Sequence, residues 1–282
     1  MSDAEPQERP DTRQPTAVEA WQRYDDDEQR LSAHVSERML DLAGLRCGMR
    51  VLDVATGRGE PAIRAALRVA PDGLVVGTDP SAEMLAFAKA RADRAAVRNL
   101  TLIATGGEQL AGLPVPSFDA ALCRWGFMYF ERPVDALKAV RSHLLPGGAL
   151  VSALWTEPER ASWWSFPRRV LARHAAQPGL SFTAPGPFRY ARSEAFRDDL
   201  AAAGFSVEHE ESLETAVMES SSPQGLIEWC LTFGLARALQ GLPESVRSAW
   251  TRDLLAEADG QRDADGMYRL GGVTRLIVAR AG

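Results

Sequence analysis

The chain has 282 residues and contains only three cysteines. Cys47, Cys123 and Cys230 are odd in number and far apart in the sequence. Such spacing provides neither a disulfide framework nor the closely spaced ligand pairs of a structural metal site. We therefore predict no bound metal, and we expect a cytoplasmic protein.

Long apolar runs and long basic runs are also missing. No segment approaches the 20 or so apolar residues of a membrane-spanning helix, and residues 1–20 are polar, without the apolar core of a signal peptide. The formal net charge is −6, whereas nucleic-acid binding normally requires a basic surface. We expect no membrane insertion and no nucleic-acid partner, and the oligomeric state stays open.

The segment from Val51 to Val69 carries the pattern on which the other predictions depend. Residues 51–54 are typical of a buried parallel strand, and the positions from Ala62 onward have the apolar spacing of a helix. Between them, Gly57 and Gly59 allow a sharp turn that lets the backbone approach a ligand closely. Strand, glycine turn and helix N-terminus together predict a nucleotide-type cofactor site at the carboxyl edge of a sheet.

Two cofactors are compatible with this turn. The pattern Gly57-x-Gly59-x-x-Ala62 matches the dinucleotide fingerprint, and the next strand ends in Asp79, about 20 residues further on, where a ribose-binding acid is required. This favours an NAD(P)-dependent oxidoreductase, although the chain has no Tyr-x-x-x-Lys pair. The alternative depends on an additional acid, Asp53, at the end of the first strand.

From Asp53 the chain reads Asp-Val-Ala-Thr-Gly-Arg-Gly, which resembles the first motif of the class I S-adenosylmethionine-dependent methyltransferases. That motif is an acid followed by alternating small residues, and Ala55 stands where the family usually has a glycine. Pro146-Gly147-Gly148, between a helical pattern and a strand pattern, is similar to a later motif of the family. The resemblance covers roughly residues 46 to 155 and is closest to the small-molecule branch that methylates quinones and menaquinones.

The resemblance implies an α/β fold with a doubly wound, seven-stranded, mostly parallel Rossmann-like sheet, an antiparallel last strand, and a helical and loop cap over its carboxyl edge. Residues 1–20 are expected to form a disordered arm, and residues 21–282 a single methyltransferase domain. The predicted cap elements are residues 21–45, 156–192 and 217–265. Within the first, the acidic cluster at 25–28 is expected to separate two helices.

The resemblance also implies contacts to the cofactor. The Asp79 carboxylate would accept both ribose hydroxyls, and Met84 would lie against the adenine or the ribose. The family usually has an adenine-binding acid where this chain has Gly106, so backbone groups there, or groups elsewhere, would have to replace it. The predicted cofactor-binding residues are Asp53, Ala55, Thr56, Gly57, Gly59, Asp79, Pro80, Met84, Gly106, Gly107, Glu108 and Arg124.

An aromatic segment after the fourth predicted strand indicates the acceptor site. We assign Arg124 to the methionine end of the cofactor, Trp125 and Met128 to the acceptor wall, and Tyr24 to a lid; simple packing is the alternative for Trp125 and Met128. The aromatic residues between 156 and 192 predict a small, partly apolar or aromatic acceptor. His174 is the one histidine nominated as a base, against its interpretation as a surface residue.

The sequence therefore predicts an enzyme that transfers a methyl group from S-adenosylmethionine to a small natural-product or quinone-like acceptor, leaving S-adenosylhomocysteine. The alternatives are an NAD(P)-dependent oxidoreductase and an S-adenosylmethionine-binding protein without catalysis. Whether carbon, oxygen or nitrogen is methylated stays open.

Overall fold

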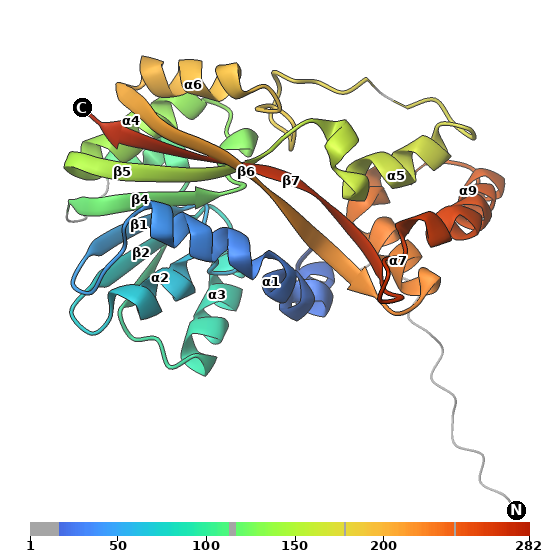
Figure 1. Ribbon diagram of the computed structural model, residues 1–282, viewed down its shortest axis with the longest axis horizontal. Coiled ribbons are helices and arrows are strands. Elements are labelled where there is room, and N and C mark those ends of the chain that lie inside the picture. Colours follow the sequence, from blue (N-terminus) through green and yellow to red (C-terminus); the bar gives the residue numbers. More distant parts are fainter. Residues whose placement is uncertain (1–16, 113–116, 178, 240) are drawn as a thin grey trace, which may run out of the picture.

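One twisted sheet organises the described residues, 17–112, 117–177, 179–239 and 241–282, of this computed structural model (Figure 1). The seven strands follow the order β3-β2-β1-β4-β5-β7-β6. They are β1 (Arg50–Val54), β2 (Leu74–Asp79), β3 (Leu100–Ala104), β4 (Phe118–Arg124), β5 (Leu144–Trp155), β6 (Phe205–Ser220) and β7 (Tyr268–Ala281). β1 to β5 pair in parallel, and β7 is antiparallel to both β5 and β6. The predicted mostly parallel sheet with an antiparallel last strand is confirmed.

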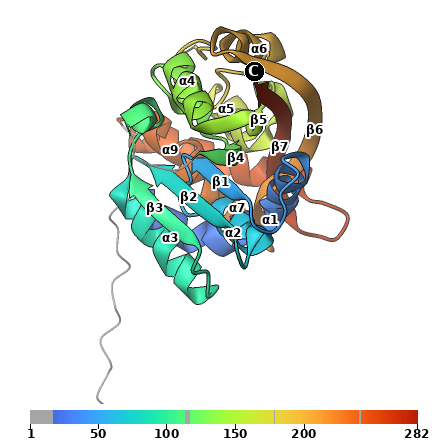
Figure 2. The ribbon, with the colours of Figure 1, turned by 90° about the vertical axis from the view of Figure 1, so that its left-hand side faces the viewer.

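Helices cover both faces of the sheet, as Figure 2 shows. The helices α1 (Ala17–Leu42), α2 (Ala62–Val69) and α3 (Ala82–Arg94) lie on one face, and α4 (Pro133–His143) and α6 (Ser193–Ala202) lie on the other. The central strands are therefore buried on both sides, which is why their sequences are almost continuously apolar. Leu52 of β1 packs into the core of one face and Leu122 of β4 into the core of the other.

A cap extends from the carboxyl edge of the sheet, carried by the long strands β6 and β7 (Figure 1). β7 leaves the sheet where its pairing with β5 ends, at Thr274. The cap helices are α5 (Ser162–Leu171), α7 (Pro223–Trp229), α8 (Ala236–Leu239) and α9 (Glu244–Glu257), with a π-helical segment at Cys230–Gly234. The fully buried Trp250 joins α9 to α5, because its indole N–H donates to the carbonyl of Pro167 at 3.0 Å.

The N-terminal region differs from the expectation in two respects. α1 is one continuous helix of 26 residues, so the acidic cluster does not separate two helices. Two acids of the cluster pair with cations: Asp27 with Arg30 in the same helix, and Glu28, which turns inward, with Arg58. The helix also begins at Ala17, inside the span expected to be disordered, whereas residues 1–16 lie outside the described part of the chain.

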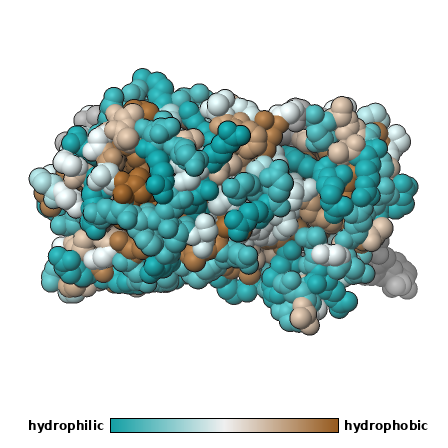
Figure 3. Space-filling view, turned by 45° about the horizontal axis from the view of Figure 1, so that its top comes forward, coloured by the Kyte–Doolittle hydropathy of each residue, from teal (hydrophilic) through white to brown (hydrophobic). Residues whose placement is uncertain are grey.

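The face seen in Figure 3 is largely hydrophilic, with hydrophobic side chains in separate patches. Large apolar side chains that are exposed include Leu67 on α2, Phe182 before α6 and Leu255 on α9. Within the described residues, none of the helices combines the length and the apolar character that crossing a membrane requires.

We expect Leu122→Ala to lower the free energy of unfolding by about 2–5 kcal/mol, because truncation of a fully buried leucine leaves a cavity in the central strand. Leu67→Ala removes the same atoms from a side chain that is 57% exposed, and it should change this free energy by less than about 0.5 kcal/mol. Urea unfolding followed by circular dichroism measures both. Equal effects would contradict the central position of β4.

Candidate active site

The site begins at the turn between β1 and α2. Ala55, Gly57 and Gly59 have φ angles of 56°, 53° and 89°, in the left-handed region that glycine adopts most readily. The backbone N–H of Thr56 donates to the carbonyl of Thr78 at 2.8 Å and ties the turn to β2. A Cβ added to Gly57 would meet no other described atom within 4 Å. The face of the turn at Gly57 is thus open to a ligand.

Asp53 lies beneath this turn and is fully buried. Its Oδ2 accepts hydrogen bonds from the Thr56 hydroxyl at 2.6 Å and from the backbone N–H of Ala62 at 3.1 Å. Its Oδ1 has no hydrogen-bond partner among the described residues. Burial raises the pKa of Asp53 to about 7, against the opposing effects of the Thr56 hydrogen bond and the charge of Arg124. A buried acceptor without a partner is a place where a ligand with N–H groups gains a hydrogen bond.

Asp79 stands beside the turn at the end of β2. Its Oδ2 accepts from the backbone N–H of Gly57 and its Oδ1 from that of Ser81, both at 2.9 Å. Burial raises the pKa of this carboxyl group, and the two backbone hydrogen bonds act in the opposite direction. The carboxylate is held at the carboxyl edge of the sheet and is only partly buried, so its remaining lone pairs can accept from a ligand hydroxyl.

A cavity of about 140 Å³ lies against the turn, and most of its lining residues are of polar or charged types. It is referred to below as the polar cavity. Its lining residues are Glu28, Gln29, Ala55, Thr56, Gly57, Arg58, Glu60, Arg124 and Trp125. The structure therefore brings Ala55, Thr56 and Gly57 of the turn together with Arg124, which comes from the end of β4, whereas Gly59 does not line the cavity.

Two lining residues were not among the predicted site residues. Glu28 of α1 and Arg58 of the glycine turn meet at the side of the cavity that faces α1. The Glu28 carboxylate forms a buried ion pair with Arg58 through Oε2, and its Oε1 lies 3.7 Å from Nη2 of Arg124. Arg124 also donates to the hydroxyl of Ser32 at 2.7 Å. The signal that could have found Glu28 is its spacing, because Tyr24, Glu28 and Ser32 are four residues apart and share one helix face.

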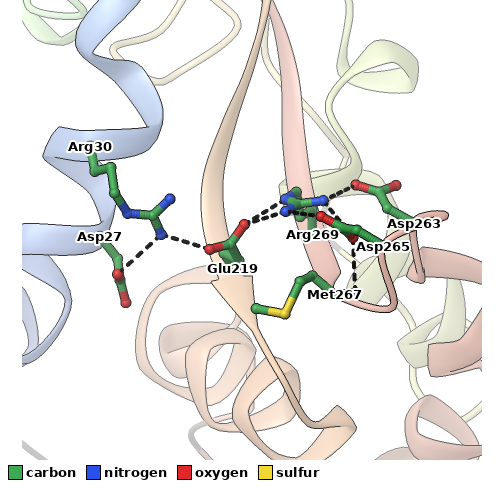
Figure 4. A network of polar contacts seen from close by, with 7 residues as sticks. All are labelled: Asp27, Arg30, Glu219, Asp263, Asp265, Met267 and Arg269. Atoms are coloured by element: carbon green, nitrogen blue, oxygen red, sulfur yellow. Dashed lines mark hydrogen bonds and ion pairs between the residues drawn. The ribbon is translucent and has the colours of Figure 1, made fainter.

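A second ionic network fixes α1 to the cap strands (Figure 4). Arg30 donates to Glu219 of β6 at 2.7 Å, and Glu219 also accepts from Arg269 of β7 at 2.6 Å. Asp263 and Asp265 pair with the same Arg269. The segment of α1 that carries Glu28 is thus held to the glycine turn on one side and to the cap on the other.

A larger cavity of about 290 Å³ adjoins the polar cavity and is almost entirely aromatic. It is referred to below as the aromatic cavity. Its lining residues are Tyr24, Glu28, Trp125, Tyr129, Trp155, Trp163, Val217, Trp229 and Phe233. Glu28 and Trp125 line both cavities, so the two meet at these side chains.

Trp125 is held rigidly at this junction. Its φ of 57° is unusual for a bulky residue, and such backbone strain persists only where the surroundings enforce it. The indole stacks on Trp155 with ring centroids 4.6 Å apart, and its N–H donates to the hydroxyl of Thr274 at 2.9 Å. The backbone N–H of Trp125 donates to the carbonyl of Ala153. These contacts make Trp125 a fixed wall of both cavities.

Two of the predicted site residues lie away from both cavities. Met128 is fully buried in the core and lines neither cavity, because the short 3-10 helix Phe127–Tyr129 turns Met128 inward and leaves Tyr129 facing the aromatic cavity. His174 also lines neither cavity; its Nε2 lies 2.9 Å from Oδ2 of Asp253, in a pair between the segment after α5 and helix α9. Tyr24, by contrast, faces the aromatic cavity and packs edge-on against Phe233, with ring centroids 5.5 Å apart.

The remaining predicted residues lie along the neighbouring strand ends. Pro80 and Met84 follow Asp79 at the start of α3. Gly106, Gly107 and Glu108 follow β3. None of these five residues lines either cavity.

The side chain of Gln109 covers the loop after β3. A Cβ on Gly106 would collide with Oε1 of Gln109, and one on Gly107 would collide with the ring of Phe130. A side chain at position 107 would therefore have to displace an aromatic ring, whereas one at position 106 would displace only the flexible end of Gln109.

Comparison with known proteins shows the family of this chain. Residues 51–148 match a family model described as a methyltransferase domain. The nocamycin O-methyltransferase of Saccharothrix syringae is 32% identical over 243 residues, which span 80% of this chain and 85% of that protein. The demethylmenaquinone methyltransferase of Thermus thermophilus is 34% identical over 184 residues, spanning 61% and 81%. The chain belongs to the S-adenosylmethionine-dependent methyltransferases.

The fold of this methyltransferase agrees with that assignment. The crystal structure of an S-adenosylmethionine-dependent methyltransferase from Aquifex aeolicus superposes with a TM-score of 0.52 at 20% identity, covering 70% of this chain and 92% of the other. The family that the sequence relatives show uses S-adenosylmethionine as its cofactor, and the nicotinamide alternative is wrong. The residues present fit this group: Asp53 offers an unpartnered buried oxygen, and Gly57 leaves open space above the turn.

The raised pKa of Asp53 predicts a pH-dependent contribution to stability. Its pKa is about 7 in the folded protein against an ordinary value of 3.8, so between these values the folded chain holds a proton that the unfolded chain has released. The contribution of Asp53 to the free energy of unfolding is therefore full below about pH 4, falls as the pH rises, and is level above about pH 7.

Asp53→Asn removes this titration, so the free energy of unfolding of the variant should rise relative to that of the wild type as the pH increases from about 5 to about 8. Urea unfolding of both proteins without cofactor, at several pH values in this range, measures the difference. A difference that stays constant across the range would contradict the raised pKa.

Proposed function

We propose that this methyltransferase acts on a small, partly apolar or aromatic acceptor of the natural-product or quinone type. The observation that carries the proposal is the aromatic cavity that opens onto the polar cavity at Glu28 and Trp125. Apolar walls with a few polar groups are typical of sites for small organic ligands. The names of the relatives, a nocamycin O-methyltransferase and a demethylmenaquinone methyltransferase, support an acceptor of this kind.

For the cofactor side, we propose that the polar cavity takes the methionine end, with Arg124 as a polar partner in its wall and Asp53 as a second partner beneath the turn, outside the cavity lining. Asp79 is oriented by the backbone N–H groups of Gly57 and Ser81, and we assign its free lone pairs to the ribose hydroxyls. Gln109 lies over Gly106, and we assign its side-chain amide to the adenine edge. These roles use the polar atoms that the folded chain leaves at the ends of β1, β2 and β3.

The chemistry divides between the cofactor and the chain. S-adenosylmethionine supplies a methyl group made electrophilic by the positive charge on its sulfur. The chain holds the acceptor at the junction of the two cavities, where Trp125 is fixed by its stack and hydrogen bond. Tyr24 from α1 and Trp229 from α7 form part of the enclosing wall and exclude water. Holding the reacting atoms in line accounts for up to about 7–11 kcal/mol of the barrier.

Asp79→Ala should weaken the affinity for S-adenosylhomocysteine tenfold or more, because the variant loses the acceptor for the ribose hydroxyls and the anchor of the Gly57 backbone. Asp79→Asn, which keeps the volume of the side chain, separates lost hydrogen bonding from lost packing. Asp135→Ala on α4, where the carboxylate is 50% exposed, is the control. Calorimetric titration measures all three affinities, and an unchanged affinity for Asp79→Ala would refute the ribose-binding role.

The proposed function itself is tested with two experiments on the purified protein. Calorimetry should show binding of S-adenosylhomocysteine and none of NADH. Radiolabelled S-adenosylmethionine should then transfer its methyl group to members of a panel of small quinols, phenols and enols. Binding of the cofactor without transfer to any compound would favour the alternative of a binding protein without catalysis.

A further inference from the structure

Glu28 is the one charged side chain among the described residues that line the aromatic cavity. Its neighbours there are aromatic apart from Val217, and the carboxylate is itself largely buried. An ionisable group in an apolar site costs free energy unless other groups compensate for its burial. Arg58 and Arg124 supply that compensation from the side of the polar cavity.

The two oxygens of Glu28 are not equivalent. Oε2 accepts the hydrogen bond of Arg58. Oε1 lies 3.7 Å from Nη2 of Arg124, which is longer than a hydrogen bond, and no described residue donates a hydrogen bond to it. Oε1 therefore keeps acceptor capacity at the point where the aromatic and polar cavities meet.

We propose that Glu28 determines acceptor specificity by binding a hydroxyl group of the acceptor through Oε1. This inference rests on the proposed function and adds the class of acceptor, a phenol or an enol with a flat ring system that lies against Trp125. A hydroxyl oxygen bound to Glu28 lies where the two cavities meet. If the polar cavity takes the methionine end of the cofactor, the methyl group is delivered at the same place. The proposal therefore favours O-methylation over C-methylation.

The charges around Glu28 favour a hydroxyl group over an amine. The guanidinium groups of Arg58 and Arg124 already offset the negative charge of the carboxylate. A protonated amine would therefore gain little binding free energy from Glu28, and both guanidinium groups would repel it. An alkylamine with a pKa near 10 is also largely protonated at neutral pH and then has no lone pair for attack. An uncharged hydroxyl group keeps its lone pairs for attack and donates a hydrogen bond to Oε1 through its O–H.

The test is a calorimetric titration with two probes, 2-naphthol and 2-methoxynaphthalene, on protein saturated with S-adenosylhomocysteine. The probes share a ring system that suits the aromatic cavity, and only the first can donate a hydrogen bond. For the wild type we expect 2-naphthol to bind at least about tenfold more tightly, the usual gain from a hydrogen bond to a charged group. The ratio of the two affinities is the readout, because a variant that only loosened the cavity would weaken the binding of both probes to a similar extent.

Glu28→Gln should reduce this ratio to about threefold or less, because a neutral amide is a weaker acceptor. The control is Asp27→Asn, the same chemical change one residue away, at a side chain that is 53% exposed (Figure 4); it should keep the wild-type ratio. Glu28→Asp retains the negative charge for the arginines but withdraws the carboxylate by one methylene group, so it should also lower the ratio. This second variant decides the question if Glu28→Gln does not fold.

Three outcomes would overturn the proposal: equal affinities of the two probes for the wild type, no binding of either probe, or a ratio that survives in the Glu28 variants. Failure of the proposed function is recognised separately, because the protein would then not bind S-adenosylhomocysteine at all.

Discussion

The buried contact of Glu28 with Arg58 and Arg124 determines how α1 is seated over the glycine turn. Withdrawing one carboxylate and two guanidinium groups from water costs several kcal/mol for each ion, and their mutual attraction offsets much of that cost only in one arrangement. We infer that the cluster contributes more to the specific seating of α1 on the glycine turn than to net stability. Removal of Glu28 would leave two buried cations without this partner, so the position of the helix and the charges of the site depend on each other.

The same helix couples the cofactor region to the cap. Glu28 contacts Arg58 of the glycine turn, and Arg30, two residues further along α1, contacts Glu219 of β6. β6 and β7 continue from the sheet into the cap without a flexible linker, and Gly272 of β7 packs closely against Ala161 and Trp155. The walls of the aromatic cavity, although they come from distant parts of the sequence, are therefore anchored to one sheet and one helix.

The parts of the site that sequence could predict are those formed by local patterns. The strand, turn and helix from Val51 to Val69, and the acid that ends β2, follow from periodicity and from glycines whose backbone conformation few other residues adopt. The position of Asp53 near the end of β1 could be predicted for the same reason, because it is itself a local feature.

The helix break was wrong, and the positions of His174 and Met128 outside both cavities were not foreseen, because each depends on contacts that sequence does not show. The acidic cluster suggested a helix break because its compensating cation, Arg58, is 30 residues away. His174 has its partner Asp253 at a separation of 79 residues. Met128 and Tyr129 are adjacent, and only the 3-10 turn of Phe127–Tyr129 decides which of them faces the cavity. Hydrophobic pattern alone does not distinguish them.

The site separates its charged groups from its aromatic ones, and this separation follows from the fold. Asp53 and Asp79 are fixed by backbone N–H groups at the ends of parallel strands, so their positions change little when side chains elsewhere change. The aromatic walls are side chains from α1, the cap helices and the strand ends, and they are fixed by packing. Substitutions at Trp229 or Phe233 can therefore alter the shape of the aromatic cavity without moving Asp53 or Asp79. Glu28 and Trp125 are constrained from both sides, because each lines both cavities, and a change at either affects both halves of the site.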